Sequence, residues 1–227
     1  MILTTGIAEI SRMFRQRFLP GTTVHVLPGN SDRIAQAARM AGMNIAFRAA
    51  SLWPFPDLID GLSRRGTPGV ELVGRDEIAQ HNAVRDFLVT GIRSAPGGAA
   101  IIEVPLRATM SALRADADIV ARSPRLPGAA GQVFFEVKTG RFSEIRPNQG
   151  YVYSLALIGQ HVRSEHPGLQ TVGLVPGAPL PPMDFILAHT DPRDRDIRFA
   201  LILASQVARE QSLAQIMAHV EAVRSAP

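Results

Sequence analysis

The chain has 227 residues, enough for one large domain or for a compact domain with a small appendage. Hydrophobic residues make up 46% of it, so a real core can be buried and wholesale disorder is not expected. The absence of cysteine excludes disulfides, thiolate zinc sites and cysteine nucleophiles, and the net charge of +4 suits a polyanionic partner without identifying one. We expect no ordinary signal peptide and no membrane span, because the N-terminus lacks a long apolar run behind a basic start and no stretch approaches ~18 uninterrupted apolar residues.

Residues 1–70 are predicted to form a mostly helical lead-in. Apolar side chains recur there at helical spacing: Ile7, Ile10, Met13 and Phe14. Ser31 is suited to cap a helix that continues to roughly Met43. The prolines of residues 53–56 break regular structure, and residues 63–69 form a polar, glycine-containing connector.

Residues 71–227 are predicted to form the main domain. The elements expected there are a helix over 76–90 ended by Gly91, strands over 99–104, 113–120 and 132–138, a helix from 149 to about 163, and strands over 171–175 and 183–189. Residues 196–203 alternate like a strand but run into a helical pattern, so that segment stays open, and a helix is expected from Ser205 to Val223. This order predicts an α/β (α+β) fold, with a mixed β-sheet flanked by helices and helical segments at both ends.

Charged residues cluster on two of the predicted strands. Residues two apart in a strand face the same side, so Asp116 and Asp118 are expected to share one face, and Glu136 and Lys138 one face of the next strand. If these strands pair, three carboxylates and an ammonium converge. Because such a cluster repels itself, a divalent cation is expected to stabilise it, and carboxylate oxygens suit Mg²⁺ or Mn²⁺.

Lys138 is unusual in this chain. Of the 24 basic residues it is the only lysine. In a chain that otherwise uses arginine, a remaining lysine points to a position where a compact ammonium is needed and a planar guanidinium does not serve. Lys138 is therefore predicted to orient a water molecule or to stabilise an anionic transition state.

A family resemblance rests on the same residues. Asp118-Ile119-Val120, a turn-rich loop and the run Phe134 to Gly140 resemble the PD-(D/E)xK nuclease signature, an acidic residue before two apolar ones and then E-x-K on a hydrophobic strand. The continuation Arg146 to Gln149 is similar to the version found in polymorphic bacterial toxins, and Tyr153 completes a Q-x-x-x-Y arrangement. The resemblance covers about residues 71–190 and implies a restriction-endonuclease-like core.

The resemblance also implies roles for single residues. Asp118 and Glu136 would hold Mg²⁺ or Mn²⁺, with Asp118 preferred to Asp116 because two apolar residues follow it. Further roles fall on these residues: Glu77 as an auxiliary metal ligand, Gln149 beside the catalytic set, and Arg141, Arg146, Tyr153 and Asp116 as substrate contacts. His81, one helical turn beyond Glu77, is interpreted as a structural or surface histidine.

The implied function is a magnesium-dependent endodeoxyribonuclease acting between bacteria as a toxin or effector. Such a protein would have a DNA substrate, a cognate immunity protein and a secretion-system carrier (type VI among them), and no membrane partner. It would be cytoplasmic in the producer and delivered to the target-cell cytoplasm. Two alternatives stay open: a non-catalytic nucleic-acid-binding or protein-binding module on the same scaffold, and a host repair or defence nuclease.

Overall fold

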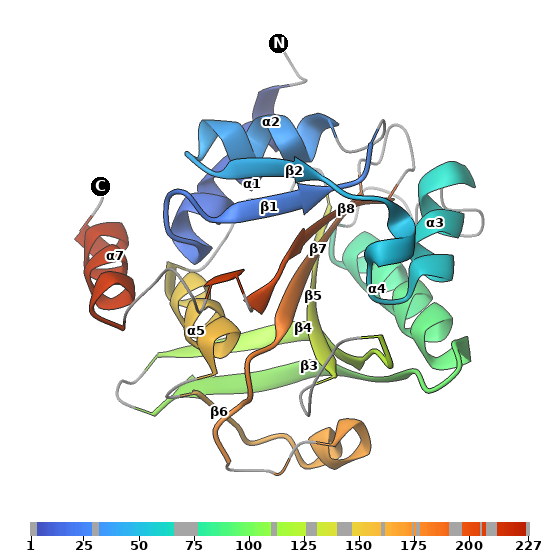
Figure 1. The fold of residues 1–227 in the computed structure, drawn as a ribbon. Coiled ribbons are helices and arrows are strands. Elements are labelled where there is room, and N and C mark those ends of the chain that lie inside the picture. The colour runs from blue at the N-terminus through green and yellow to red at the C-terminus, as the bar shows by residue number, and fades with distance from the viewer. Residues whose placement is uncertain are drawn as a thin grey trace.

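The computed structural model describes residues 4–28, 32–65, 77–109, 113–125, 131–139, 147–159, 162–173, 175, 178–190, 197–204, 206–207 and 213–225. Within these ranges the chain is α+β, with helices on both faces of a mixed sheet (Figure 1). The helices are α1 (Thr4–Arg17), α2 (Asp32–Met40), α3 (Pro56–Arg65), α4 (Glu77–Ser94), α5 (Pro147–Ile158) and α7 (Leu213–Ser225), with 3₁₀ turns η1 (Ala50–Leu52) and η2 (Pro167–Val172). The strands are β1 (Thr23–Val26), β2 (Asn44–Phe47), β3 (Ala99–Ala108), β4 (Arg114–Arg122), β5 (Gln132–Thr139), β6 (Val162–Ser164), β7 (Asp184–Thr190) and β8 (Ile197–Ile202).

The described strands form one open sheet in the order β2-β1-β8-β7-β5-β4-β3-β6. The pairs β1–β2 and β5–β7 are parallel, and the other neighbouring pairs are antiparallel. β5 is buried along its whole length. A strand that is covered on both faces reads as a continuous apolar run, and this is the pattern around the FFEV segment of β5.

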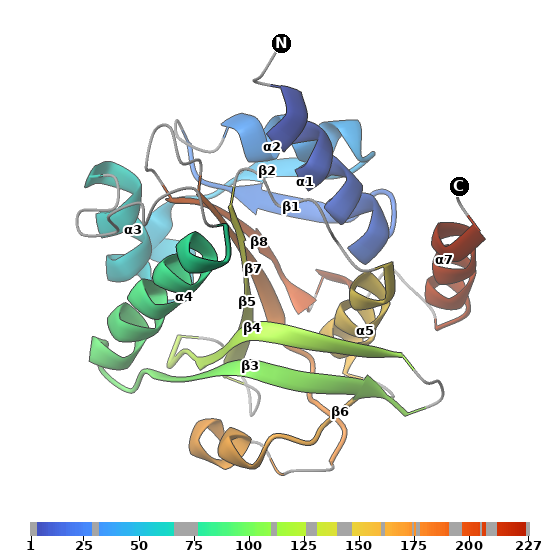
Figure 2. The ribbon, with the colours of Figure 1, turned by 180° about the vertical axis from the view of Figure 1, so that it is seen from behind.

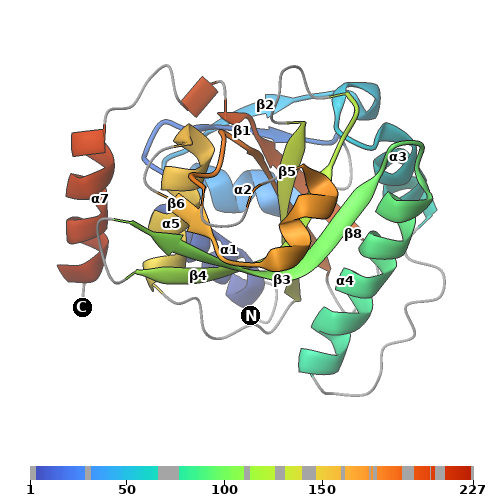
Figure 3. The same ribbon diagram turned by 90° about the horizontal axis from the view of Figure 1, so that it is seen from below.

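Two apolar cores lie on the two faces of this sheet. One contains residues of α1, α2, α5 and α7, and the other contains residues of α3 and α4. The two groups of helices lie on opposite sides of β5, β7 and β8 when the molecule is seen from in front and from behind (Figures 1 and 2). The view from below shows the same separation, with α4 far from α5 and α7 (Figure 3). Each core side chain that leaves water contributes about 1.5–3 kcal/mol, so both layers stabilise β5.

The N-terminal residues contribute more to the sheet than their sequence predicts. Besides helices they form β1 and β2, and β1 pairs with β8. Both strands have four residues, too short for a periodic pattern to stand out. Residues 53–55 are irregular, as predicted, and α3 begins at Pro56, since proline is tolerated in the first turn of a helix. The connector predicted over 63–69 begins within α3, and its residues 66–69 lie outside the described ranges.

Three predicted boundaries are wrong for identifiable reasons. α4 continues through Gly91 to Ser94, because Gly91 provides room for the Leu58 side chain of α3 and does not end the helix. α5 ends at Ile158, before Gly159, whose φ of +71° suits a residue that terminates a helix, and the predicted helical end is instead β6. The predicted strand over 171–175 begins within the 3₁₀ turn η2.

The C-terminal part resolves the segment that stayed open. Ile197–Ile202 forms strand β8, which pairs with both β7 and β1. A helix follows, as predicted, with α7 spanning Leu213–Ser225. The apolar alternation of residues 197–202 is therefore a strand signal, and the helical pattern that follows belongs to the next element.

Candidate functional site

β4 and β5 form the antiparallel pair predicted from the charge pattern. Their ladder runs from Arg122↔Gln132 to Ile119↔Phe135. Continuing this register by one residue places Asp118 opposite Glu136. There the Asp118 carboxylate takes over the role of a backbone group, because its Oδ2 accepts a hydrogen bond from the Val137 N–H at 2.7 Å. Asp118 thus meets β5 between Glu136 and Lys138.

A distortion of β3 and β4 accompanies this contact. Ala117 belongs to the core under α1 and α5, whereas Ile119 belongs to the core under α3 and α4. Residues two apart in a regular strand face the same side, so β4 reverses its facing at Asp118. β3 reverses at the same register, since Val104 and Ile102 pack on opposite sides and Glu103 between them has a φ of +50°. Positive φ is costly for a residue other than glycine.

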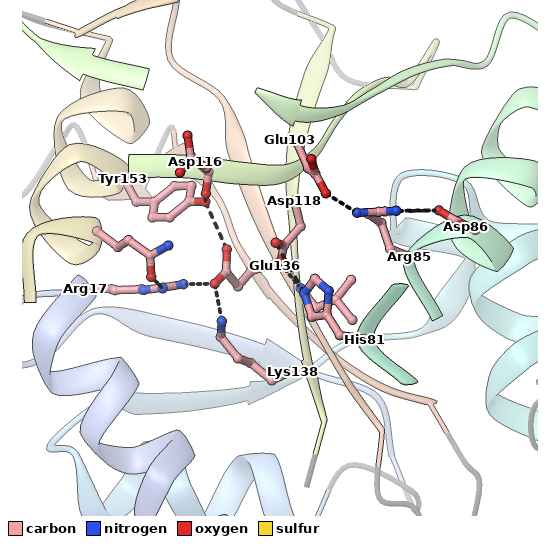
Figure 4. A network of polar contacts seen from close by, with 12 residues as sticks. Arg17, His81, Arg85, Asp86, Glu103, Asp116, Asp118, Glu136, Lys138 and Tyr153 are labelled. Carbon is pink, nitrogen blue, oxygen red and sulfur yellow. Dashed lines mark hydrogen bonds and ion pairs between the residues drawn. The ribbon is translucent and has the colours of Figure 1, made fainter. Parts of the chain in front are cut away.

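α4 holds both strands at this distortion. His81 and Arg85 lie one helical turn apart and therefore on the same side of the helix. His81 Nε2 lies 3.3 Å from Asp118 Oδ1, and Arg85 forms an ion pair with Glu103 (Figure 4). Arg85 is itself oriented by Asp86, at 3.0 Å. α4 therefore contacts both strands at the distortion, β4 through His81 and β3 through Arg85.

Glu136 lies at the centre of a separate set of contacts on the α1 side. Its side chain is 1% exposed, and its Oε1 lies 2.6 Å from both Arg17 Nη1 and Lys138 Nζ. Its Oε2 accepts a hydrogen bond from the Tyr153 hydroxyl at 2.9 Å. The Arg17 guanidinium also lies over the Tyr153 ring, 5.0 Å from its centroid, and donates to the Gln149 side chain. Figure 4 shows these groups converging on one carboxylate.

Close packing of α1 against α5 brings Arg17 to this position. A Cβ on Gly150 would collide with the backbone of Gln16 and Arg17, so glycine permits the approach. Ser154, one turn further along α5, donates to the Arg17 carbonyl and also to the Gly150 carbonyl. The last turn of α1 is therefore bound to α5 through both backbone and side chain.

These contacts determine the charge of the site. Burial alone would raise the pKa of Glu136, but the charges of Arg17 and Lys138 outweigh it and lower this pKa to about 2. Burial, followed by the charge of Glu136, raises the pKa of Tyr153 well above its ordinary value. Burial opposes protonation of His81, yet its hydrogen bond to Asp118 and the charge of that residue raise its pKa. Glu136 is therefore ionised and Tyr153 is a neutral hydrogen-bond donor at neutral pH.

The predicted site residues are distributed unevenly. Asp118 lies in the set of contacts on the α4 side, and Glu136, Lys138, Gln149 and Tyr153 lie in the set on the α1 side. Asp116 does not join it through its side chain: its backbone carbonyl accepts from Tyr153, while its exposed side chain lines a hollow of about 260 Å³ with Arg107, Arg114 and Gln149. Asp118 contacts His81 on the α4 side and Glu136 contacts Arg17 on the α1 side, so the convergence of three carboxylates on one patch stays a prediction.

Three further predictions lie outside what the structure describes. Arg141 and Arg146 belong to the undescribed residues 140–146. Glu77 begins α4, but its side chain is not among those described. Their proposed roles therefore remain predictions.

His81, interpreted as a structural or surface histidine, contacts Asp118, which is compatible with a structural role. One residue of these contacts was missed by the sequence interpretation. Arg17 was not considered, although a signal existed: with Ile10, Met13 and Phe14 it completes the i, i+3, i+4, i+7 pattern of a buried helix face. A charged residue at a core position requires a buried partner, and here that partner is Glu136.

The described side chains do not fit a metal ion in this arrangement. Both oxygens of Glu136 are used by Arg17, Lys138 and Tyr153, and both oxygens of Asp118 are used by Val137 and His81. No group of three histidine, aspartate or glutamate side chains able to hold a metal occurs within the described ranges. Arg17 and Lys138 already provide the positive charge for which a divalent cation was invoked.

The fold and the site define an α+β protein with a buried Arg-Glu-Lys cluster at a distorted strand pair. None of the helices that the structure describes is long and apolar enough to cross a membrane. Comparison with protein-family models, with curated proteins and with solved structures found no match.

Proposed function

We propose that this chain is a metal-dependent nuclease that hydrolyses phosphodiester bonds, with DNA as its substrate class and Asp118, Glu136 and Lys138 as its central residues. One observation carries the proposal. The Asp118 carboxylate contacts the backbone of Val137, between a glutamate and the chain's only lysine on the same strand. The relationship to PD-(D/E)xK nucleases, including a restriction-endonuclease-like core, is part of the proposal and is supported by the sequence resemblance and the mixed sheet.

The residues would act as follows. Lys138 supplies an ammonium that can stabilise negative charge developing on a phosphate. Asp118 is the more accessible of the two carboxylates, at 18% side-chain exposure against 1% for Glu136, so it is the one that an incoming substrate would meet first. His81 orients Asp118 from α4. The requirement for Mg²⁺ or Mn²⁺ comes from the resemblance.

A second candidate is a non-catalytic nucleic-acid-binding or protein-binding module. The occupied oxygens of Glu136 favour it, since a carboxylate held by Arg17 and Lys138 is a stable structural element in its own right. A module of this kind would bind a nucleic acid or a protein without cutting it, with or without Mg²⁺.

The deciding experiment uses two matched aspartates. Purified parent protein, Asp118→Asn and Asp116→Asn are incubated with plasmid DNA and with RNA, in Mg²⁺ and in excess EDTA. We expect the parent and Asp116→Asn to cut DNA only with Mg²⁺, and Asp118→Asn to be inactive. Cutting that persists in EDTA contradicts the metal requirement. Binding without cutting by all three proteins establishes the second candidate.

The bacterial setting is a separate part of the proposal. An antibacterial effector with an immunity partner should arrest growth and degrade the chromosome when it is produced without that partner. Asp118→Asn, produced to the same level, should be harmless. Equal growth arrest by both proteins would assign the toxicity to something other than this site, and a nuclease active in vitro but harmless in bacteria would favour a repair or defence role.

A further inference from the structure

One of the two cations that contact Glu136 comes from a part of the chain that the nuclease resemblance does not cover. Arg17 lies at the end of α1, its side chain is 0% exposed, and it pairs with Glu136 at 2.6 Å. A buried ion pair is stable only when its geometry is good and its remaining polar atoms have partners. Gln149 provides such a partner for Arg17 Nη2 and Tyr153 provides one for the carboxylate, whereas Arg17 Nε has no hydrogen-bond partner among the described residues.

α1 is not a loosely attached cover over the site. Its apolar face is part of the core, with Ile10, Met13 and Phe14 all at most 4% exposed. Its last turn is bound to α5 at Gly150 and Ser154. Displacing Arg17 by movement of the helix would therefore open a core, so the guanidinium is a fixed component of the site.

We infer that Arg17 is a positioning residue that occupies the cation position at Glu136 and keeps a free divalent ion from binding there. Its charge and that of Lys138 both face Oε1, and a third positive charge at this oxygen meets repulsion from both. Glu136 is thereby held ionised and in one orientation. The inference rests on the proposed function only in treating Glu136 as a candidate metal ligand.

The ion pair between Arg17 and Glu136 affects how strongly the free protein can bind a metal ion. Mg²⁺ and Mn²⁺ are often held by one or two carboxylates together with substrate phosphate. With Glu136 neutralised by Arg17, the free protein retains Asp118 as its accessible carboxylate. Metal binding by the free protein is then weak, and removal of the guanidinium strengthens it.

The test is calorimetric titration of Mn²⁺ alone into the full chain and its variants. Arg17→Gln removes the charge and keeps a polar group for Glu136, and it should bind Mn²⁺ about tenfold to a hundredfold more tightly than the parent, the size expected for loss of one nearby charge in a partly polar interior. Arg17→Lys retains the charge and should stay as weak as the parent. Arg15→Gln is the matched control, since Arg15 is exposed on the same helix and contacts Ser11 and Met40.

Circular dichroism establishes whether each variant is folded. If Arg17→Gln does not fold, Gln149→Ala serves in its place, because it leaves the charge but removes a partner that holds the guanidinium against Glu136. A severalfold gain in Mn²⁺ affinity is expected. Tight Mn²⁺ binding by the parent that is abolished by Glu136→Gln overturns the inference, as does an unchanged affinity in the folded Arg17 or Gln149 variant. These readouts need no cleavage, so failure of the proposed function is recognised separately.

Discussion

Glu136 and Asp184 are two carboxylates buried in one sheet, on the neighbouring parallel strands β5 and β7, yet their pKa values move in opposite directions. Burial raises the pKa of Asp184 to about 6, against a hydrogen bond from the Ala204 N–H and the charge of Arg48. Burial acts on Glu136 in the same sense, but Arg17 and Lys138 lower its pKa to about 2. Burial is therefore common to both, and close contact with cations decides the direction in which the pKa moves.

The largest expected effect comes from removing the charge of Glu136. In Glu136→Gln the two cations lose their common partner, and removing one member of a buried ion pair costs about 3–5 kcal/mol. Urea denaturation at pH 7.5 should show this loss. A loss below about 1 kcal/mol would mean that water molecules solvate Arg17 and Lys138 in the variant. The contrast with Asp184 would then not depend on the pairing of these cations with Glu136. Because Glu136→Gln is expected to lower stability, Asp118→Asn is the cleaner probe of activity.

The next effect concerns which cation Glu136 has beside it. Lys138→Arg keeps the charge but places a wider, planar group where a compact ammonium lies. We expect a folded protein whose cleavage activity falls on the order of 10²-fold or more. Lys138→Ala should lose at least as much activity and keep most of its DNA binding, because other arginines are expected to contact the phosphates of the DNA. Cleavage and binding assays on both variants measure this, and near-parent cleavage by Lys138→Arg would make the lone lysine a compositional accident.

Asp184 provides the matching test with the opposite sign. The pKa of Asp184 in the folded protein, about 6, lies above its unfolded value near 4. Ionisation of Asp184 therefore lowers the free energy of unfolding by its full amount above pH 6, and this loss disappears as the pH falls from about 6 to about 4. Asp184→Asn should therefore be more stable than the parent at pH 7.5, on the order of 2 kcal/mol. The difference should shrink at pH 4.5. A constant difference across this pH range would show that the carboxyl does not titrate as stated.

The smallest effect tests a neutral neighbour of Glu136. Tyr153→Phe removes a hydroxyl that donates to the Asp116 carbonyl and to Glu136, and loss of one such hydrogen bond costs about 1 kcal/mol. Thermal unfolding measures this loss. If it matched that of Glu136→Gln, hydrogen bonding rather than charge would be the main stabilisation of the buried carboxylate.

The sequence predicted elements where the side-chain period was long and regular. The strands around Asp118 and Glu136, the helix that begins at Pro147 and most of α4 follow from period and turn residues. The four-residue strands β1 and β2 did not, because their pairing depends on β8 far along the chain. A pattern read one segment at a time carries no information about such partners.

The site shows the same limit. Contact between Glu136 and Lys138 follows from the two-residue period of a strand and was predicted. The different surroundings of Asp116 and Asp118 were not, since they depend on how α4 and other distant segments pack around β4. Arg17 was missed because its relation to Glu136 is set by the packing of α1 on α5 and by no local motif.

The ion pair between α1 and β5 also has a consequence for the order in which the molecule can assemble. Arg17 joins residues more than a hundred positions away, and its carbonyl is bound by Ser154, 137 residues further on. Contacts between such distant residues form late, because long loops must close before any of these interactions are gained. α1 is synthesised before β5 and α5, so the Arg17 side chain meets Glu136 only after those elements have followed. The charged centre of this protein is therefore completed only after α5 has been made.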